Sequence, residues 1–259
     1  MMILLASSVG KLGIIIDMES SIDKCDPPLN MNSPIAVVPA RGGSKRIPRK
    51  NIRLFNGKPM IGYAIRTLQE SNLFEAIYVS TDDEEIASIS ESFGATVPFL
   101  RPASLSGDAV GTAPVIADFL NSLNISPSRL VCCTYATNPF LDSENLISAF
   151  KRITATPTAD YACAIAKYDY PIQRSLHLDS SGLIQMVDPE NLLRHSQSFD
   201  DRWHDAGQFY FAKCETWKSG KPMLMNTLGI EVEKWRCVDI DDEDDWKKAE
   251  LLHKVNSSV

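Results

Sequence analysis

Short apolar runs alternate with amphipathic segments through much of the chain, and this alternation predicts its fold. The runs that we interpret as buried strands lie at residues 35–39, 76–80, 96–99, 130–134 and 161–166. The segments that we interpret as the intervening helices lie at residues 60–71, 82–93, 113–123 and 143–153. Strands that alternate with helices indicate an α/β fold with a doubly wound, mainly parallel sheet.

The pattern changes at Tyr168. From there to Asp205 the sequence consists of hairpin-like pieces, with a turn expected at Asp179-Ser180-Ser181-Gly182. We interpret the region 168–205 as an insertion. Regular elements then return, with strands expected at 207–212, 229–233 and 236–240 and helices at 214–219 and 242–254.

The first 33 residues do not fit the alternation. Their apolar stretches are interrupted by Lys11, and no run reaches the roughly 20 apolar residues of a membrane span. A linker-like segment with two prolines follows at 23–33. We therefore expect residues 1–33 to form a disordered extension, with Met31 as an alternative start, and residues 34–259 to form the domain.

A concentrated group of cations follows the first predicted strand. The segment 41–53, here called the basic loop, contains no acidic residue, although the whole chain has a formal net charge of −7. Its basic residues are Arg41, Lys45, Arg46, Arg49, Lys50 and Arg53. Backbone amides at Gly42 and Gly43 allow the close approach of an anion. The loop therefore indicates an anionic ligand, with a solvated charged loop as the alternative.

Composition and motifs exclude several other classes of protein. The basic loop has neither the GxxxxGK[ST] pattern of a P-loop nor the GxGxxG pattern of a dinucleotide-binding dehydrogenase. A pI near 5.2 argues against general nucleic-acid binding. The six cysteines form no CxxC pair, and we interpret them as reduced, buried thiols of a cytoplasmic protein.

Asp239 and Asp241 form a second candidate site. In an extended strand, residues i and i+2 face the same way, so the two carboxylates would point together. Such a pair repels itself unless a cation lies between the oxygens, and Mg2+ prefers oxygen ligands. Capping of the last helix is the alternative role of these acids. Together with the basic loop at the same carboxyl edge of the sheet, the pair suits phosphoryl or nucleotidyl transfer.

A third polar group lies just before the strand expected at 207–212. His204, Asp205 and Gln208 could meet a polar substrate at this position. Taken alone, the local sequence slightly favours a structural hydrogen-bonded pair of His204 and Asp205.

The motifs, in their order and spacing, resemble those of one enzyme family. Residues 39–52, Ser80-Thr81-Asp82-Asp83, Arg101-Pro102 with Asp108 and Thr112, and Asp239-Ile240-Asp241 resemble the acylneuraminate cytidylyltransferases, the CMP-sialic acid synthetase family. The resemblance extends from about residue 35 to residue 253. Segment 203–210 is similar to the pseudaminic acid branch, whereas Arg46 and the segment 135–139 depart from the sialic acid branch.

This resemblance implies a nucleotide-diphospho-sugar transferase-like fold and a step of nucleotide-sugar biosynthesis. CTP and an acidic nine-carbon sugar, pseudaminic acid in particular, would give the CMP-sugar and pyrophosphate. The implied CTP-binding residues are Arg41, Gly42, Ser44, Lys45, Lys50, Asn51, Ser80 and Arg101. Lys50 and Arg41 are the implied catalytic residues.

The resemblance also implies a cofactor, sugar contacts and a partner. Mg2+ would be held by Asp239 and Asp241, the sugar would be contacted by His204, Asp205 and Gln208, and the insertion would form a homodimer. N-acetylneuraminic or legionaminic acid is an alternative substrate, and a non-catalytic nucleotide-binding protein is an alternative of another class. The general base stays open between a side chain and a metal-bound hydroxide.

Overall fold

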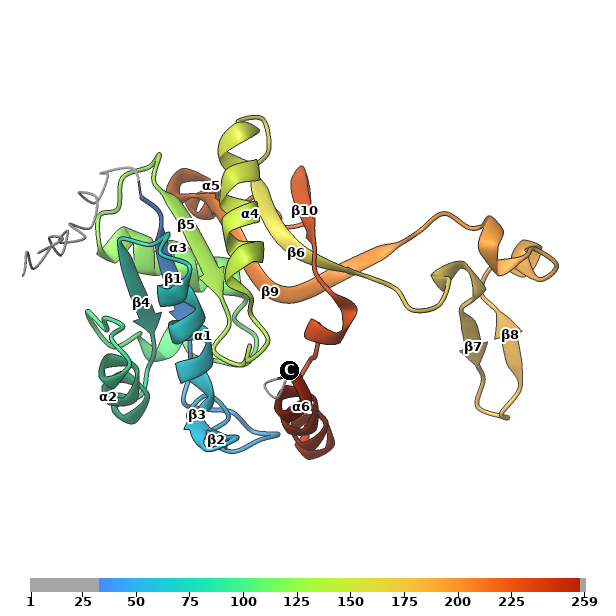
Figure 1. The fold of residues 1–259 in the computed structure, drawn as a ribbon, viewed down its shortest axis with the longest axis horizontal. Helices are drawn as coiled ribbons and strands as arrows, with labels where there is room; N and C mark the ends of the chain where they lie inside the picture. Colours follow the sequence, from blue (N-terminus) through green and yellow to red (C-terminus); the bar gives the residue numbers. More distant parts are fainter. Residues whose placement is uncertain (1–32, 257–259) are drawn as a thin grey trace, which may run out of the picture. The chain divides into compact units, whose positions relative to one another are not determined.

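A six-stranded mixed sheet forms the centre of the domain (Figure 1). The computed structural model describes residues 33–256, so the extension and the start expected within residues 1–33 lie outside the described residues except for Ser33. The strands of the sheet, in spatial order, are β10 (Thr227–Glu231), β6 (Tyr161–Lys167), β9 (Trp203–Lys213), β5 (Leu130–Thr134), β1 (Ile35–Pro39) and β4 (Ala76–Ser80). Only β9 runs antiparallel to its neighbours among these strands, which confirms the predicted mainly parallel α/β sheet.

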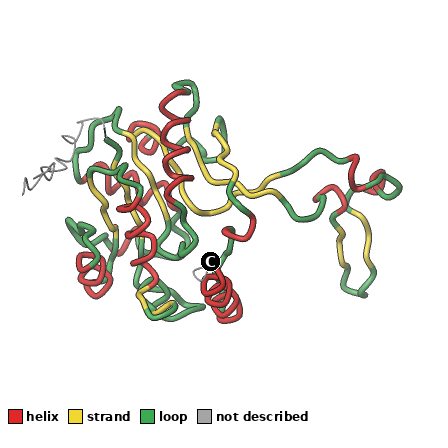
Figure 2. Tube along the Cα trace, viewed as in Figure 1, coloured by secondary structure: helices red, strands yellow, loops and turns green. Residues whose placement is uncertain are grey.

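Helices cover both faces of this sheet, as the red and yellow segments of Figure 2 show. The helices α1 (Met60–Glu70), α2 (Glu84–Ser92) and α4 (Ser143–Ala155) contribute side chains to the core on one face. The helices α3 (Thr112–Ser122) and α5 (Cys214–Lys218) contribute side chains to the core on the other face. None of the described helices is long and apolar enough to cross a membrane.

Neighbouring strand residues point to opposite faces of the sheet, as the pleat of a strand requires. Val38 and Cys132 lie in the core beneath α1 and α4, whereas Val37 and Cys133 lie in the core beneath α3. The five cysteines in the described part of the chain are free, and four of them are buried. Burial raises the pKa of Cys133, so this thiol stays protonated and acts as a small apolar side chain.

A third, smaller core joins the basic loop to the C-terminal helix α6 (Glu243–Asn256). Ile47 of the loop is fully buried there with Ile240 and Trp246. The strands β2 (Leu54–Phe55) and β3 (Lys58–Pro59) close the loop with a tight turn through Asn56 and Gly57, both at positive φ. Apolar contacts therefore support one side of the basic loop, while several of its charged side chains, such as Lys45 and Arg46, stay exposed.

Two expected strands are absent between residues 33 and 256. The segment 96–99 forms only an isolated bridge from Thr96 to Tyr78, and Pro98 lacks the amide that a longer ladder would need. The segment 236–240 is irregular and follows a 3₁₀ turn at Lys234–Arg236. Its apolar residues pack into the cores beside the sheet without joining it, so the strand prediction was wrong there.

The segment between β6 and β9 consists of short elements, and we call residues 168–202 the arm. Its strands β7 (Leu176–Leu178) and β8 (Ile184–Met186) form an antiparallel hairpin. The Asp179 carboxylate accepts hydrogen bonds from the Ser181 and Leu183 amides, which stabilises the turn predicted at 179–182. The remaining 3₁₀ turns of the described chain lie at Ala103–Leu105, Ile172–Arg174, Pro189–Asn191 and Ser196–Ser198.

Candidate active site

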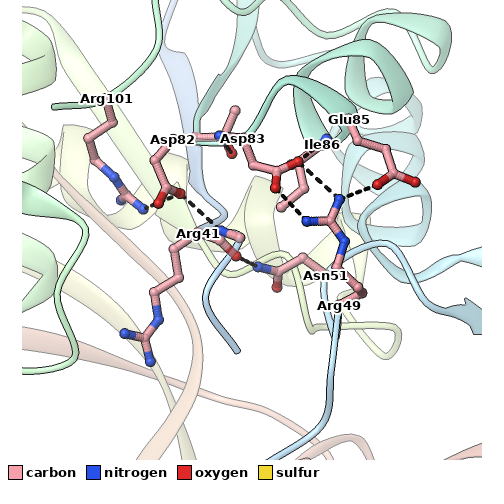
Figure 3. Close-up of polar contacts among 10 residues, drawn as sticks. Arg41, Arg49, Asn51, Asp82, Asp83, Glu85, Ile86 and Arg101 are labelled. Atoms are coloured by element: carbon pink, nitrogen blue, oxygen red, sulfur yellow. Dashed lines mark hydrogen bonds and ion pairs between the residues drawn. The ribbon is translucent and has the colours of Figure 1, made fainter. Parts of the chain in front are cut away.

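The basic loop leaves the carboxyl end of β1 beside the end of β4. The amide of Ala40 donates to the Ser80 carbonyl, which continues the pairing of the two strands into the loop. The Asn51 side chain donates to the Arg41 carbonyl at 2.8 Å and closes the loop across its base (Figure 3). The predicted site residues of the loop and of β4 therefore meet at one edge of the sheet, where α/β folds bind ligands.

Arg49 fastens the loop to the start of α2. Its guanidinium binds both carboxylate oxygens of Asp83, with an Nη2–Oδ1 distance of 3.0 Å, and it also pairs with Glu85 (Figure 3). The backbone of Arg49 is left-handed, with φ of 56°, which a non-glycine residue adopts only where its surroundings hold it. Arg49 is thus a structural clamp, whereas its neighbour Lys50 lines the cleft beside the loop.

A cleft of about 570 Å³ opens beside this loop, and we call it the cationic cleft. Six of the predicted CTP-binding residues line it, namely Arg41, Ser44, Lys45, Lys50, Asn51 and Arg101. Gly42 and Ser80 are not among its lining residues, although both lie at the same edge of the sheet. The structure therefore brings most of the predicted nucleotide residues into one polar cavity.

The cations of this cleft already meet carboxylate oxygens. Asp108 accepts from Lys45 at 2.6 Å and from Arg41 at 2.5 Å, and these hydrogen bonds lower the pKa of the Asp108 carboxyl. Arg46 binds Asp241 at 2.7 Å across the cleft. An oxyanion placed here would be within reach of the same charged groups, as a bound phosphate requires.

Lys50 connects the basic loop with the segment that carries the two predicted metal ligands. Its Nζ donates to the Ile240 carbonyl and lies 3.8 Å from Oδ1 of Asp241. Burial lowers the pKa of Lys50, and the carboxylates of Asp241 and Asp239 oppose this shift. Asp241 lines the cleft, whereas Asp239 is exposed and is not among the lining residues. The two aspartates lie on irregular backbone, so the strand geometry assumed for them does not hold.

The amide of Gly42 has a partner within the protein. It donates to Oδ1 of Asp82 at 2.9 Å. A Cβ atom at Gly42 would lie 2.7 Å from Oδ2 of Asp83, which leaves no room for a side chain. Gly42 therefore lets the loop pass close to Asp82 and Asp83 at the start of α2.

Arg101 supplies a buried cation at the far wall of the cleft. The residue is only 7% exposed, and its Nη2 lies 3.8 Å from Oδ1 of Asp82, toward which it points in Figure 3. Its Nε is buried without a hydrogen-bond partner, and burial lowers the pKa of the guanidinium. A buried cation with an unused donor favours an anionic or polar ligand at this wall.

The three predicted sugar residues lie on β9 and do not line the cationic cleft. The His204 ring lies 4.9 Å from the Tyr168 ring beside a separate hollow of about 280 Å³. Asp205 accepts from the Gly207 amide at 2.9 Å and from the Tyr210 hydroxyl at 2.6 Å. Gln208 is 2% exposed and donates to the Arg236 carbonyl, but its Oε1 has no partner.

An irregularity in β9 explains these positions. Opposite β6, Tyr210 pairs with Cys163 and Asp205 pairs with Ile165, so β9 contains extra residues between its two pairs. Gly207, at φ of 63°, allows this bulge, and Asp205 caps it through the Gly207 amide. The bulge turns Gln208 inward, where its backbone carbonyl accepts hydrogen bonds from the side chains of Thr134 and Asn138.

The cleft also contains residues that were not among the predicted site residues. Asp108, Thr112, Tyr135 and Thr137 line it beside the basic loop. Asp108 and Thr112 belonged to the matching motif, and Tyr135 and Thr137 directly follow the buried strand β5. Their positions at the carboxyl ends of strands, or in the loop before α3, were the sequence feature that could have identified them as site residues.

Comparison with known proteins identifies relatives of this chain. Residues 35–214 match the family model described as Cytidylyltransferase. The chain is 35% identical over 226 residues to a pseudaminic acid cytidylyltransferase of Campylobacter jejuni, covering 86% of this chain and 97% of the relative. It is 29% identical to a CMP-N,N'-diacetyllegionaminic acid synthase of Legionella pneumophila, covering 87% of this chain and 98% of the relative.

The fold is also similar to that of a solved structure. This structure is a CMP:2-keto-3-deoxy-manno-octonic acid synthetase complexed with CTP, with a TM-score of 0.65 and 14% sequence identity. The match covers 86% of this chain and 99% of the other chain. The likeness confirms the expected nucleotide-diphospho-sugar transferase-like α/β fold.

Proposed function

Because the chain belongs to the cytidylyltransferase family, we propose that it transfers a cytidylyl group from CTP to pseudaminic acid, an acidic nine-carbon sugar. The anomeric hydroxyl oxygen of the sugar forms a bond to the α-phosphorus of CTP. The bond from that phosphorus to the bridging oxygen of the β-phosphate breaks. The products are the CMP-sugar, pyrophosphate and the proton that the sugar hydroxyl loses.

The lining of the cationic cleft is the observation that carries this proposal. Its five basic side chains are Arg41, Lys45, Arg46, Lys50 and Arg101. A triphosphate needs this concentration of positive charge in a chain that is acidic overall. The chemistry also agrees with the relatives described above, a pseudaminic acid cytidylyltransferase and a CMP-N,N'-diacetyllegionaminic acid synthase.

Lys50 is the proposed principal catalytic cation, with Arg41 in support. During the transfer, negative charge develops on the oxygens of the α-phosphate and of the leaving pyrophosphate. A cation that is already held in place stabilises this charge without reorganisation. The contact with the Ile240 carbonyl fixes the Lys50 ammonium in this way. Lys45 binds the outer phosphates, Ser44 and Asn51 contact the nucleotide, and Gly42 allows the close backbone approach.

Ser80 and Arg101 are proposed to lie near the base and ribose. Arg101 is favoured for this part of the nucleotide because its buried Nε has no acceptor within the protein. Ser80 is 2% exposed and contributes mainly through its carbonyl, which holds the start of the basic loop.

We propose that Asp239 and Asp241 hold a Mg2+ ion. In nucleotide sites Mg2+ is commonly bound by one or two carboxylates together with phosphate oxygens and water, and Asp241, which lines the cationic cleft, fits as one such ligand. No group of three or more His, Cys, Asp or Glu side chains between residues 33 and 256 is arranged as a metal cage, which favours ligands from the nucleotide. When bound, the ion neutralises negative charge on the phosphate oxygens.

For the sugar, His204 and Gln208 are the proposed direct contacts. The orphaned Oε1 of Gln208 supports this role, because a substrate hydroxyl or amide could donate to it. Asp205 has two partners within β9 and is not proposed as a direct contact.

A homodimer in the cytoplasm is the proposed state of the enzyme. The arm exposes several large apolar side chains, including Leu183 at 66% and Ile184 at 63% exposure, and a second copy could cover them. The free cysteines of the described chain suit a reducing compartment, where CTP is also available.

Turnover of purified protein tests this function. The protein is incubated with CTP, Mg2+ and, separately, pseudaminic, N-acetylneuraminic or legionaminic acid, and pyrophosphate release is measured. We expect the highest kcat/KM with pseudaminic acid. A preference for another sugar would correct the substrate, whereas CTP binding without turnover of any sugar would indicate the non-catalytic alternative.

A further inference from the structure

The carboxylate of Asp108 bridges two cations of the basic loop within the cationic cleft. Its Oδ1 accepts from Nη1 of Arg41 at 2.5 Å, and its Oδ2 lies 2.6 Å from Nζ of Lys45. Each oxygen thus meets one cation, as two oxygens of a single phosphate group would do. Arg41 and Lys45 are two of the cations that we propose for the triphosphate, so an anion of the protein itself already occupies part of that site.

The charge of Asp108 opposes a phosphate at the same cations. Hydrogen bonds from Lys45 and Arg41 lower the pKa of Asp108, so its carboxylate is ionised at neutral pH. A phosphate group that approached the same two side chains would be repelled by this carboxylate. Binding of a phosphate there is therefore weakened unless the carboxylate moves away.

The two cations belong to a loop that is held in place. The carbonyl of Arg41 accepts from the Asn51 side chain at 2.8 Å. Lys45 lies two residues before Ile47, which is fully buried in the small core beside α6. When the ion pairs break, the backbone that carries the cations is thus kept in position by contacts that do not involve Asp108.

Asp108 itself belongs to an exposed turn. Residues 107–109 are exposed, and the Val110 amide donates to the Gly107 carbonyl at 3.2 Å, which closes the turn on itself. A Cβ atom at Gly107 or at Gly111 would come no closer than 3.9 Å to the surrounding atoms. No residue from 107 to 111 belongs to a hydrophobic core of the domain. The turn can therefore swing outward without breaking a core contact.

Asp241, the second acid that lines the cleft, is anchored differently. Its amide donates to Oδ2 of Asp245 at 3.1 Å. Its neighbour Ile240 is 2% exposed and packs in the small core. Displacement of Asp241 would disturb that core, so Asp108 is the acid of this cleft that a bound phosphate can move at low cost.

We propose that Asp108 is an internal competitor that occupies the subsite of the outer phosphates of CTP, turns away when CTP binds, and returns as pyrophosphate leaves. The inference rests on the proposed function, which supplies CTP as the ligand and pyrophosphate as the product. A tethered anion acts at a high effective concentration, so Asp108 excludes single anions that bind weakly. A triphosphate displaces it through contacts with further cations of the cleft. After the transfer, the same competition promotes release of pyrophosphate.

Calorimetric titrations with inorganic pyrophosphate and with CMP test the proposal without any need for turnover. Asp108→Asn keeps the size of the side chain and removes its charge, and Asp108→Ser replaces it if that variant does not fold. Asp160→Asn is the matched control, because Asp160 is paired with Lys221 at 2.5 Å at the amino end of β6 and does not line the cleft. The double variant Asp108→Asn/Lys45→Met is compared with Lys45→Met alone.

We expect Asp108→Asn to bind pyrophosphate about five- to tenfold more tightly than wild type, because two exposed ion pairs no longer compete with it. Its affinity for CMP should change by less than about twofold, since CMP has no outer phosphate. Asp160→Asn should bind both ligands as wild type does. The gain from Asp108→Asn should be smaller in the Lys45→Met background, where one of the two ion pairs is already absent.

Other outcomes would overturn the proposal. Unchanged pyrophosphate affinity would show that the carboxylate does not compete, and weaker binding would show that Asp108 positions Arg41 and Lys45 for the phosphates. An equal gain for CMP would show a general change in the field of the cleft. Failure of the proposed function is a separate result: the variant then still gains affinity for pyrophosphate, while neither wild type nor variant releases pyrophosphate from CTP.

Discussion

Arg49 and Asp83 form a bidentate ion pair that joins the basic loop to the first turn of α2. Asp83 is also the N-cap of that helix, because its Oδ1 accepts from the Ile86 amide at 3.0 Å. One carboxylate therefore starts a helix and holds the basic loop, whose cations line the cationic cleft.

Substitution of Asp83 should separate its two roles. Asp83→Ala removes the cap and the pair, and we expect a loss of about 1–2 kcal/mol in the free energy of unfolding. Asp83→Asn keeps a good cap and should lose less than about 1 kcal/mol, because the Arg49 side chain is partly exposed. Urea denaturation measures the free energy of unfolding of both variants, with Glu91→Ala at the far end of α2 as the control. Equal losses in Asp83→Ala and Asp83→Asn would contradict this division of the two roles.

The contribution of the Asp83 charge should depend on pH. The hydrogen bond from Arg49 lowers the pKa of Asp83 in the folded state. The stabilisation is therefore present above the unfolded-state pKa of about 3.9 and is lost as the pH falls through the lower, folded value. The gap in stability between wild type and Asp83→Asn should be constant from pH 7 to pH 5 and shrink below about pH 4. A difference in stability that grows as the pH falls would contradict a lowered pKa of Asp83 in the folded state.

The two neighbouring glycines of the loop should differ in their tolerance of a methyl group. A Cβ at Gly42 would lie 3.0 Å from Cβ of Asp83, whereas a Cβ at Gly43 would meet nothing within 4 Å. Gly42→Ala should lower the free energy of unfolding by about 1–3 kcal/mol. Gly43→Ala should change it by less than about 0.5 kcal/mol. Thermal and urea unfolding would show the contrast, and similar losses in both variants would refute the close approach at Gly42.

Loss of the Lys50 ammonium should affect turnover far more than folding. Lys50→Met keeps much of the buried stem but removes the charge from the cleft, so we expect kcat/KM to fall by about a hundredfold or more. Lys58→Met is the control, because Lys58 lies over the Tyr63 ring and outside the cleft. Pyrophosphate release and circular dichroism are measured together. A near-normal kcat/KM in folded Lys50→Met would show that Lys50 is not a catalytic residue.

The proposed metal ligands should alter the requirement for Mg2+. Asp241→Asn and Asp239→Asn should raise the concentration of Mg2+ at half-maximal activity by at least the roughly 10- to 100-fold seen when residues that contact metal ligands are changed. Asp244→Asn, whose side chain is 92% exposed in α6, should leave this concentration unchanged. A Mg2+ titration of the initial rate distinguishes them. If all three variants follow the wild-type curve, Asp239 and Asp241 do not bind Mg2+ and have only structural roles near the basic loop and α6.

The arm should control the oligomeric state. Ile184→Glu places a charge among exposed apolar side chains of the hairpin, and we expect it to convert a dimer into a monomer of 28.7 kDa. Leu251→Glu changes an equally exposed residue of α6 and should leave the dimer intact. Light scattering after gel filtration gives the mass. A monomeric wild type, or an Ile184→Glu dimer, would rule out this interface.

The sequence predicted the regular core more accurately than the segments around it. The run 35–39 and the run 130–134 are strands with the predicted bounds, because each is a short apolar run that ends at polar or glycine-rich residues. The same apolar signal at 236–240 comes from side chains that pack beside the sheet on irregular backbone. The pattern of apolar residues indicates burial, so it cannot distinguish a strand of the sheet from an irregular segment packed beside the sheet.

Sheet topology explains why most of the predicted nucleotide residues lie around one cleft. Lys50 and Asp241 are also close, but they meet because the irregular segment 236–240 packs against the basic loop, where the predicted strand is absent. The position of Asp205 could not be predicted, because it depends on a bulge in β9 and on Tyr210 of the same strand. The role of Arg49 as a clamp likewise depends on its contact with Asp83, which no local pattern encodes.

The small core around Ile47, Ile240 and Trp246 has a consequence for synthesis of the protein. The basic loop near the beginning of the domain is supported by side chains from near the end of the domain. In a nascent chain this support of the basic loop is therefore missing until α6 has emerged from the ribosome and packed beneath the loop. If the loop binds CTP as proposed, incomplete chains would not sequester CTP, and nucleotide binding would mark those molecules whose synthesis and folding are complete.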